Sequence, residues 1–78
     1  MTFQEVTKSV ENALTCAREM GQLEYPLMPI ALGPQFAEGS EALTQLLLWL
    51  RQRGCTYRRE EFFSPFANEN RIIYNIRQ

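Results

Sequence analysis

The chain has 78 residues, of which 45% are hydrophobic and 22% are charged, and its formal net charge is −1. These values predict one small folded domain with a single core, and they exclude a disordered chain. A net charge so close to zero indicates neither a nucleic-acid partner nor an acidic substrate. The charges are uneven, because residues 1–45 hold six glutamates against Lys8 and Arg18, whereas residues 46–78 hold six arginines against three glutamates. This asymmetry either steers a partner or arises by chance in a short chain.

The side chains that most often carry out catalysis are missing. The chain contains no histidine and no aspartate, so it lacks the usual near-neutral general base, the Ser-His and Cys-His nucleophile pairs and an imidazole metal ligand. Its two cysteines match no common zinc pattern, and its four glycines form no phosphate-binding loop. We therefore expect a protein that is not an enzyme and that needs no metal and no cofactor.

Two neighbouring carboxylates, Glu60 and Glu61, are the only adjacent pair of acids. In a strand they point to opposite faces and could not act on one substrate. We interpret them as partners of Arg58, Arg59 or Arg71 across a hairpin.

Cys16 and Cys55 are separated by 38 residues in the sequence. No basic and apolar leader is present, and no apolar run approaches the roughly 20 residues that span a bilayer. We therefore expect a cytoplasmic protein, without membrane contact, in which both thiols are buried and reduced. A single disulfide is the alternative if the chain is exported.

The first helix is predicted by a capping box, Thr2 to Glu5, "TFQE". Apolar residues follow at helical spacings, and Gly21 supplies a C-terminal stop. This apolar face comprises Phe3, Val6, Val10, Ala13, Leu14 and Ala17.

The following stretch, "LEYPLMPIALGPQF", contains three prolines that exclude a helix and a central strand. One interpretation is an extended segment or edge strand that crosses the core. Its anchors would then be Tyr25, Leu27, Ile30 and Leu32. The other interpretation is an apolar recognition loop that the prolines keep extended before it binds.

A second helix is predicted to begin after Ser40 as N-cap and to end at Gly54. Its broad apolar face comprises Leu43, Leu46, Leu47, Trp49 and Leu50. Leu48 is the exception, since it lies about 200° from Leu46 at 100° per residue, in the middle of the polar side.

The chain ends in a predicted β-hairpin, in which "CTYRREEFF" and "RIIYNIR" are the strands and "SPFANEN" is the turn. Because a two-stranded hairpin is not stable alone, it must pack on the helices, with the proline-containing segment as a possible third strand. The fold class is therefore α+β: one small domain, residues 1–78, in the order helix, extended segment, helix, hairpin, with two helices on a small antiparallel sheet.

We expect this domain to be a small protein-interaction module, an adaptor, regulator or inhibitor that binds a protein partner. Aromatic and arginine residues are frequent interface anchors, and Leu48 adds apolar surface on a polar face. The expected contact residues are Leu48, Trp49, Arg51, Phe62 and Phe66. Two points remain open: "FFSPF" either contacts a partner or folds back over the core, and Leu48 is either a contact or a solitary surface leucine.

The partner is either a second copy of the chain, joined through the second helix, or a larger protein. Small regulators and inhibitors of the latter kind are encoded by phages and mobile elements.

Nucleic-acid binding is the alternative function. A helix followed by a hairpin, with arginines on both, resembles the second half of a winged-helix domain, although this order alone identifies no family. The contacts would be Arg51, Arg53, Arg58, Arg59, Arg71 and Arg77. The acidic start of the helix, the missing space for a preceding short helix and the net negative charge argue against it.

Overall fold

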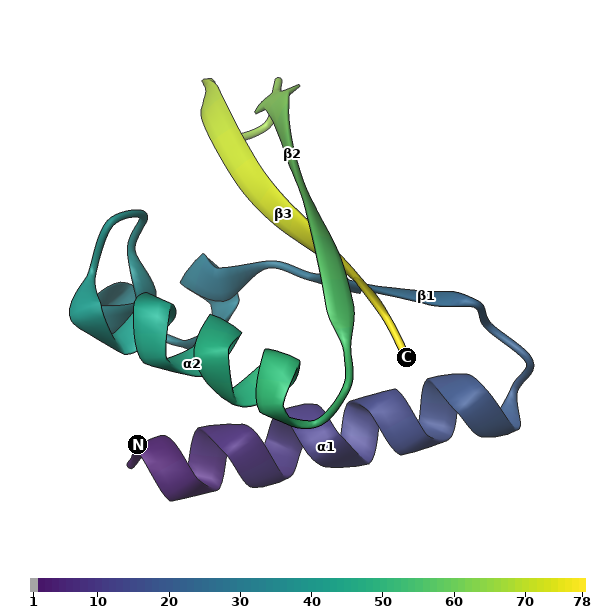
Figure 1. The fold of residues 1–78 in the computed structure, drawn as a ribbon. Helices are drawn as coiled ribbons and strands as arrows, with labels where there is room; N and C mark the ends of the chain where they lie inside the picture. The colour runs from purple at the N-terminus through teal and green to yellow at the C-terminus, as the bar shows by residue number, and fades with distance from the viewer. Residues whose placement is uncertain (1) are drawn as a thin grey trace.

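A computed structural model describes residues 2–78. It contains two helices and a three-stranded antiparallel sheet, which confirms the predicted α+β fold. The elements follow in the order α1 (Phe3–Glu19), β1 (Glu24–Leu27), the 3-10 turns η1 (Pro29–Leu32) and η2 (Pro34–Phe36), α2 (Glu41–Gln52), β2 (Thr56–Ser64) and β3 (Glu69–Arg77). The sheet order is β1-β3-β2, so the last strand is the central one (Figure 1).

Helix α1 begins with the predicted capping box. The Glu5 amide donates to the Thr2 hydroxyl at 3.2 Å, and the Thr2 amide donates to the Glu5 carboxylate at 3.0 Å. The apolar stripe that is buried against the rest of the domain comprises Val6, Val10, Leu14 and Ala17. Phe3, which the spacing places on this stripe, is 38% exposed because it lies in the first turn, at the edge of the core.

The proline-containing segment begins as an edge strand. Residues 24–27 pair antiparallel with residues 74–77 of β3. The pairing ends there because Pro29 and Pro34, which have no amide hydrogen, each start a 3-10 turn. In these turns the Ile30 side chain faces outward and is 42% exposed, so the prediction of Ile30 as an anchor was wrong. Phe36, which was not predicted to be an anchor, is buried, with 2% of its surface exposed.

Helix α2 follows the Ser40 N-cap, whose hydroxyl accepts the Leu43 amide at 3.2 Å. Its core side is formed by Leu43, Leu46 and Leu50, with Leu47 and Trp49 half-buried. Leu48 is 55% exposed, on the side that the helical wheel predicts. Of the five consecutive apolar residues 46–50, only Leu48 is therefore largely exposed to solvent.

The hairpin extends beyond the core. Strands β2 and β3 have nine residues each and leave only four turn residues, 65–68, between them, because the pairing continues into the predicted turn as far as Ser64 and Glu69. Tyr74 and Ile76 at its base are buried against the helices, whereas β2 is exposed along most of its length. The outer half therefore projects from the body of the domain (Figure 1).

Both cysteines are free thiols. Cys55 is buried between α2 and β2, as predicted, but Cys16 is exposed. The prediction for Cys16 was wrong because this residue lies beside the buried stripe of α1, between Leu14 and Ala17, and not on it.

Candidate protein-binding surfaces

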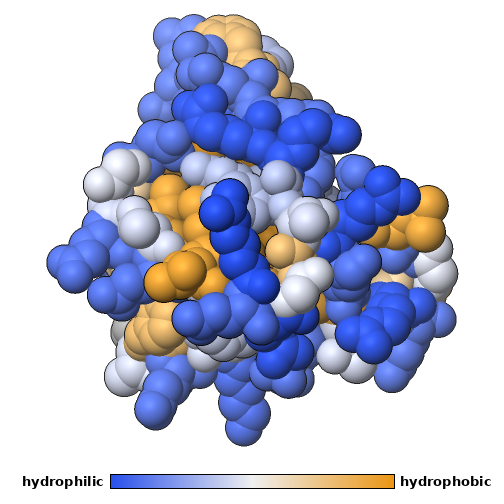
Figure 2. All heavy atoms as spheres, viewed as in Figure 1, coloured by the Kyte–Doolittle hydropathy of each residue, from blue (hydrophilic) through white to orange (hydrophobic). Residues whose placement is uncertain are grey.

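The far end of the hairpin carries three exposed phenylalanines. We call residues 62–66, "FFSPF", the hairpin tip. Phe62 is 41% exposed, Phe63 57% and Phe66 100%. Of the two sequence-based interpretations, the structure shows the exposed loop and not a turn folded over the core. Figure 2 shows a hydrophobic group at this end of the molecule, at the top of the view, above largely hydrophilic strands.

The strand register explains why the tip stays exposed. Phe62 lies opposite Arg71 and Phe63 opposite Asn70, so the first two phenylalanines point to different faces of the hairpin. Phe66 lies in the turn, two residues before Asn68, whose φ of 52° is positive. No single rotation of the hairpin would bury all three rings against the core.

Leu48 belongs to a second surface, at the base of the hairpin. It lines a shallow pocket of about 240 Å³ together with Thr44, Leu47, Arg51 and Tyr57. The Arg51 guanidinium lies 5.3 Å from the centre of the Tyr57 ring, a cation–π distance that holds this arginine against β2. The structure therefore brings Leu48 and Arg51 together.

Trp49 points elsewhere. Its ring is half-buried and lies 5.0 Å from the guanidinium of Arg53, which also pairs with Glu11 of α1 at 3.3 Å. Trp49 therefore covers the junction of the two helices and does not share the Leu48 surface.

The predicted contact residues therefore divide into separate places. Tyr57, which borders the Leu48 pocket, precedes Phe62 by five residues on β2. At roughly 3.4 Å per residue, the hairpin tip begins about 17 Å farther along the strand. One small partner surface would not contact both places.

Four of the six arginines of the alternative site are paired with glutamates. Arg58 lies 2.8 Å from Glu60 and 3.7 Å from Glu24, and Arg71 lies 3.0 Å from Glu69. Of the other two paired arginines, Arg59 pairs with Glu38 and Arg53 pairs with Glu11. Glu60 therefore pairs with Arg58, one of its expected partners, but along β2 and not across the hairpin, because neighbours two residues apart in one strand share a face.

The arginines do not form one basic surface. The register places Arg58, Arg71 and Arg77 on the outer face of the sheet and Arg59 on the inner face. Arg51 and Arg53 are at the end of α2. Each of these ion pairs offsets positive charge that an arginine would otherwise offer to a phosphate backbone.

Glu38 connects the loop before α2 to both long strands. One of its carboxylate oxygens accepts the Arg59 Nε–H at 2.8 Å, and the other accepts the Tyr74 hydroxyl at 3.1 Å. Burial and this hydrogen bond to the carboxylate raise the pKa of Tyr74, and the same carboxylate raises the pKa of Arg59. Sequence reasoning missed this site, because nothing local marks Glu38 among nine glutamates.

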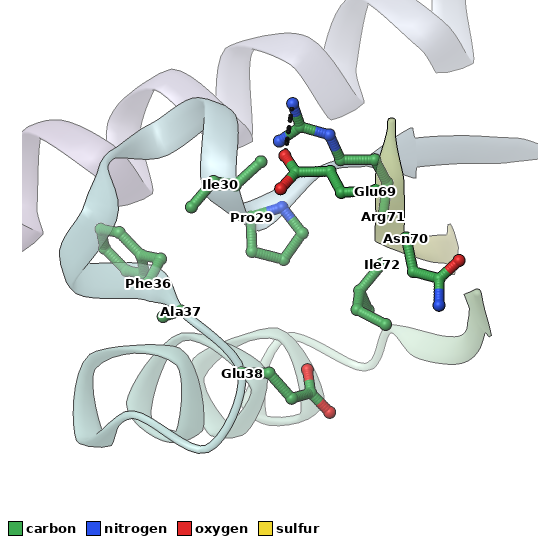
Figure 3. Close-up of a pocket in the computed structure, with 9 residues that line it drawn as sticks. All are labelled: Pro29, Ile30, Phe36, Ala37, Glu38, Glu69, Asn70, Arg71 and Ile72. Atoms are coloured by element: carbon green, nitrogen blue, oxygen red, sulfur yellow. Dashed lines mark ion pairs between the residues drawn. The ribbon is translucent and has the colours of Figure 1, made fainter. Parts of the chain in front are cut away.

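A pocket of about 230 Å³ lies between β3 and the 3-10 turns (Figure 3). Pro29, Ile30, Phe36 and Ile72 give it an apolar lining, and Glu38 lies at one end. It is also bordered by Ala37, Glu69, Asn70 and Arg71. Sequence reasoning did not find this pocket, since it is built from segments about 40 positions apart.

Among residues 2–78, no group of three or more potential ligand side chains lies close enough to hold a metal ion. In the same range, neither helix has the length and apolar character needed to cross a membrane. Comparisons of this chain with protein-family models, with curated proteins and with solved structures found no match.

Proposed function

We propose that this chain is a protein-interaction module that acts by binding through its hairpin tip. The observation that carries the proposal is the fully exposed Phe66 ring at the end of a hairpin that projects from the body, with Phe62 and Phe63 beside it. Exposed aromatic side chains of this kind are typical of binding surfaces, because a large apolar ring in water gains free energy when a partner covers it.

The strands also favour this use of the tip. The hairpin holds Phe62 and Phe63 on a paired backbone and Phe66 in the four-residue turn that closes it, so less conformational entropy is lost when a partner binds than for a free loop. A module of this size would serve as an adaptor, regulator or inhibitor. We place it in the cytoplasm, where the free Cys16 and Cys55 would stay reduced.

The test is to replace Phe66 by serine. Affinity capture from the native cell, with the purified chain as bait, should recover a stoichiometric partner, or a second copy of the chain itself, and Phe66→Ser should reduce the recovery at least about tenfold. Leu23→Ser is the matched control, because Leu23 is an apolar side chain that is 74% exposed and borders the same pocket as Cys55 and Arg77, at the end of the hairpin away from the tip. Equal recovery with both variants would contradict the proposal.

Leu48→Glu tests the second surface independently. If the hairpin tip is the binding site, this change on α2 leaves the capture intact, whereas loss of the capture would assign binding to the Leu48 pocket.

Nucleic-acid binding is the second candidate, and one observation favours it. Helix α2 leads directly into the β2–β3 hairpin, as a recognition helix leads into the wing of a winged-helix domain, and η1 and η2 occupy the place of the preceding short helix. Binding of this kind would give an affinity for duplex that falls steeply with salt. It would also be lost in Arg58→Glu and unaffected by Phe66→Ser, which is the reverse of the result expected for the protein interface.

A further inference from the structure

The central strand, β3, pairs with β2 on one side and with β1 on the other, and the pairing with β1 covers only part of its length. Strand β1 pairs with residues 74–77, so within the described residues 2–78 no strand lies beside residues 69–73 of β3 on that side. The pocket of Figure 3 lies against this free edge, because it is bordered by four consecutive residues of β3, Glu69 to Ile72. Consecutive side chains point to opposite faces, and only a pocket along the strand edge touches all four.

The pocket has the size and lining for one aromatic side chain. Its volume is about 230 Å³, and Pro29, Ile30, Phe36 and Ile72 offer apolar surface. In Figure 3, Ile30 and Pro29 lie on one side of the opening and Ile72 on the other. An unpaired strand edge next to an apolar pocket is the arrangement that binds an added strand, through main-chain hydrogen bonds and one inserted side chain.

We propose that the added strand is β3 of a second copy of this chain, paired antiparallel along residues 69–71, with Phe66 of each copy in the pocket of the other. The inference rests on the proposed function, since it names the partner that the hairpin tip binds. Pocket and inserted ring lie within six residues of one another on the same hairpin, so a two-fold arrangement satisfies both at once.

The charges select one register. Residues that lie opposite each other share a face, so a two-fold axis must pass through a residue and not between two. An axis at Asn70 places Glu69 of each copy opposite Arg71 of the other, whereas an axis at Arg71 places the two arginines face to face. The Asn70 register also brings the second copy's Asn68 level with Ile72, so that the turn with Phe66 begins beside this pocket residue, two positions before the Leu27–Tyr74 pair.

The outer edge of β2 is less suited to this pairing. Four charged residues follow one another there, Arg58 to Glu61, and charges along an edge strand oppose strand addition. Two pockets touch β2, and they do so at Thr56 and Tyr57, at the base of the hairpin.

The test is a charge exchange measured by sedimentation equilibrium on the purified full chain. The wild type should reach twice its 9.1 kDa mass as the concentration rises. Glu69→Arg and Arg71→Glu should each dissociate at least about tenfold more readily, because like charges then face each other. An equimolar mixture of the two variants should dimerise about as strongly as the wild type, since each variant supplies the charge that the other lacks.

Three results would overturn the inference. These are a single-chain mass at every concentration, a dimer that neither charge variant weakens, and a mixture that dissociates like its components. Phe66→Ser distinguishes failure of this inference from failure of the proposed function. If the purified chain stays monomeric while Phe66→Ser still abolishes capture of a different protein, the hairpin tip is a binding site but its partner is not a second copy.

Discussion

At the scale of single residues, Glu38 connects the loop before α2 to strands β2 and β3, which are distant from it in the sequence. Its carboxylate accepts hydrogen bonds from Arg59 on β2 and from Tyr74 on β3, while Glu38 itself lies in the loop before α2. Tyr74 is also packed edge-on against Tyr57, with ring centres 5.6 Å apart. The phenol of Tyr74 is thus buried with one charged acceptor, which favours its neutral form.

This environment gives the stability of the protein a dependence on alkaline pH. The ordinary pKa of tyrosine is 10.0, and burial and Glu38 raise that of Tyr74 in the folded state. The resulting stabilisation is fully present below the ordinary pKa and is lost as the pH rises through the folded-state pKa. We expect Glu38→Gln to lower the pKa of Tyr74, measured by NMR of its ring carbon, and to reduce the alkaline loss of unfolding free energy, measured by urea denaturation.

Glu41→Gln is the control for this titration, because Glu41 makes its side-chain contact with Gln45 in the first turns of α2. This variant should leave the pKa of Tyr74 unchanged. The same pKa in Glu38→Gln as in the wild type would show that burial alone sets it.

At the scale of elements, helix α2 shows how position within one apolar run decides the role of a side chain. Leu46 is completely buried, whereas Leu48, two residues later, is 55% exposed. Two residues correspond to about 200° around a helix, so the two leucines point in nearly opposite directions.

We therefore expect very different effects from the same substitution. Leu46→Ala removes packed atoms from the core and should lower the free energy of unfolding by about 2–5 kcal/mol. Leu48→Ala should change it by less than about 0.5 kcal/mol, because its side chain is largely in water. Urea denaturation followed by circular dichroism measures both, and similar losses for the two variants would mean that α2 is rotated from the orientation described.

At the scale of the whole molecule, one core joins every element. It lies between the sheet and the two helices, and its buried residues come from α1, α2, β1, β3, η2 and the α2–β2 junction. Leu32 of η1 and Tyr57 of β2 are partly buried and pack against it. Cys55 occupies that junction, 7% exposed, and its amide donates to the Leu50 carbonyl at 3.0 Å. Because so little of Cys55 is exposed, its thiol becomes fully accessible only when α2 separates from the sheet.

The two thiols should therefore react with an alkylating reagent at very different rates. Cys16 is exposed and should be labelled at once, whereas Cys55 should be labelled only as the domain unfolds. Intact mass spectrometry should show one rapid and one slow addition, with the slow rate rising with urea in parallel with global unfolding. Cys16→Ser should abolish the rapid addition and leave the rate of the slow addition unchanged. Rapid labelling of Cys55 in native buffer would contradict a single cooperative core.

Features that depend on residues close together in the sequence could be predicted, whereas features that depend on distant residues could not. The start of α1 at Thr2, the Ser40 cap of α2 and the outward Leu48 could all be predicted, because capping and helical periodicity act over three or four residues. The two hairpin strands were also predictable from their composition. Their full length was not, because pairing as far as Ser64 and Glu69 depends on both strands together.

What the sequence alone determined about this protein is therefore its two capped helices, its terminal hairpin and the α+β class that they form. The tertiary structure decided the pairing of residues 24–27 with 74–77, the burial of Phe36 and the partners of the arginines. It also decided that Leu48 and the hairpin tip belong to separate surfaces. The strand pairing joins residues 47 to 53 positions apart, and Glu38 lies 21 positions from Arg59. The free energy of such contacts comes from packing and charge in three dimensions, which no local pattern encodes.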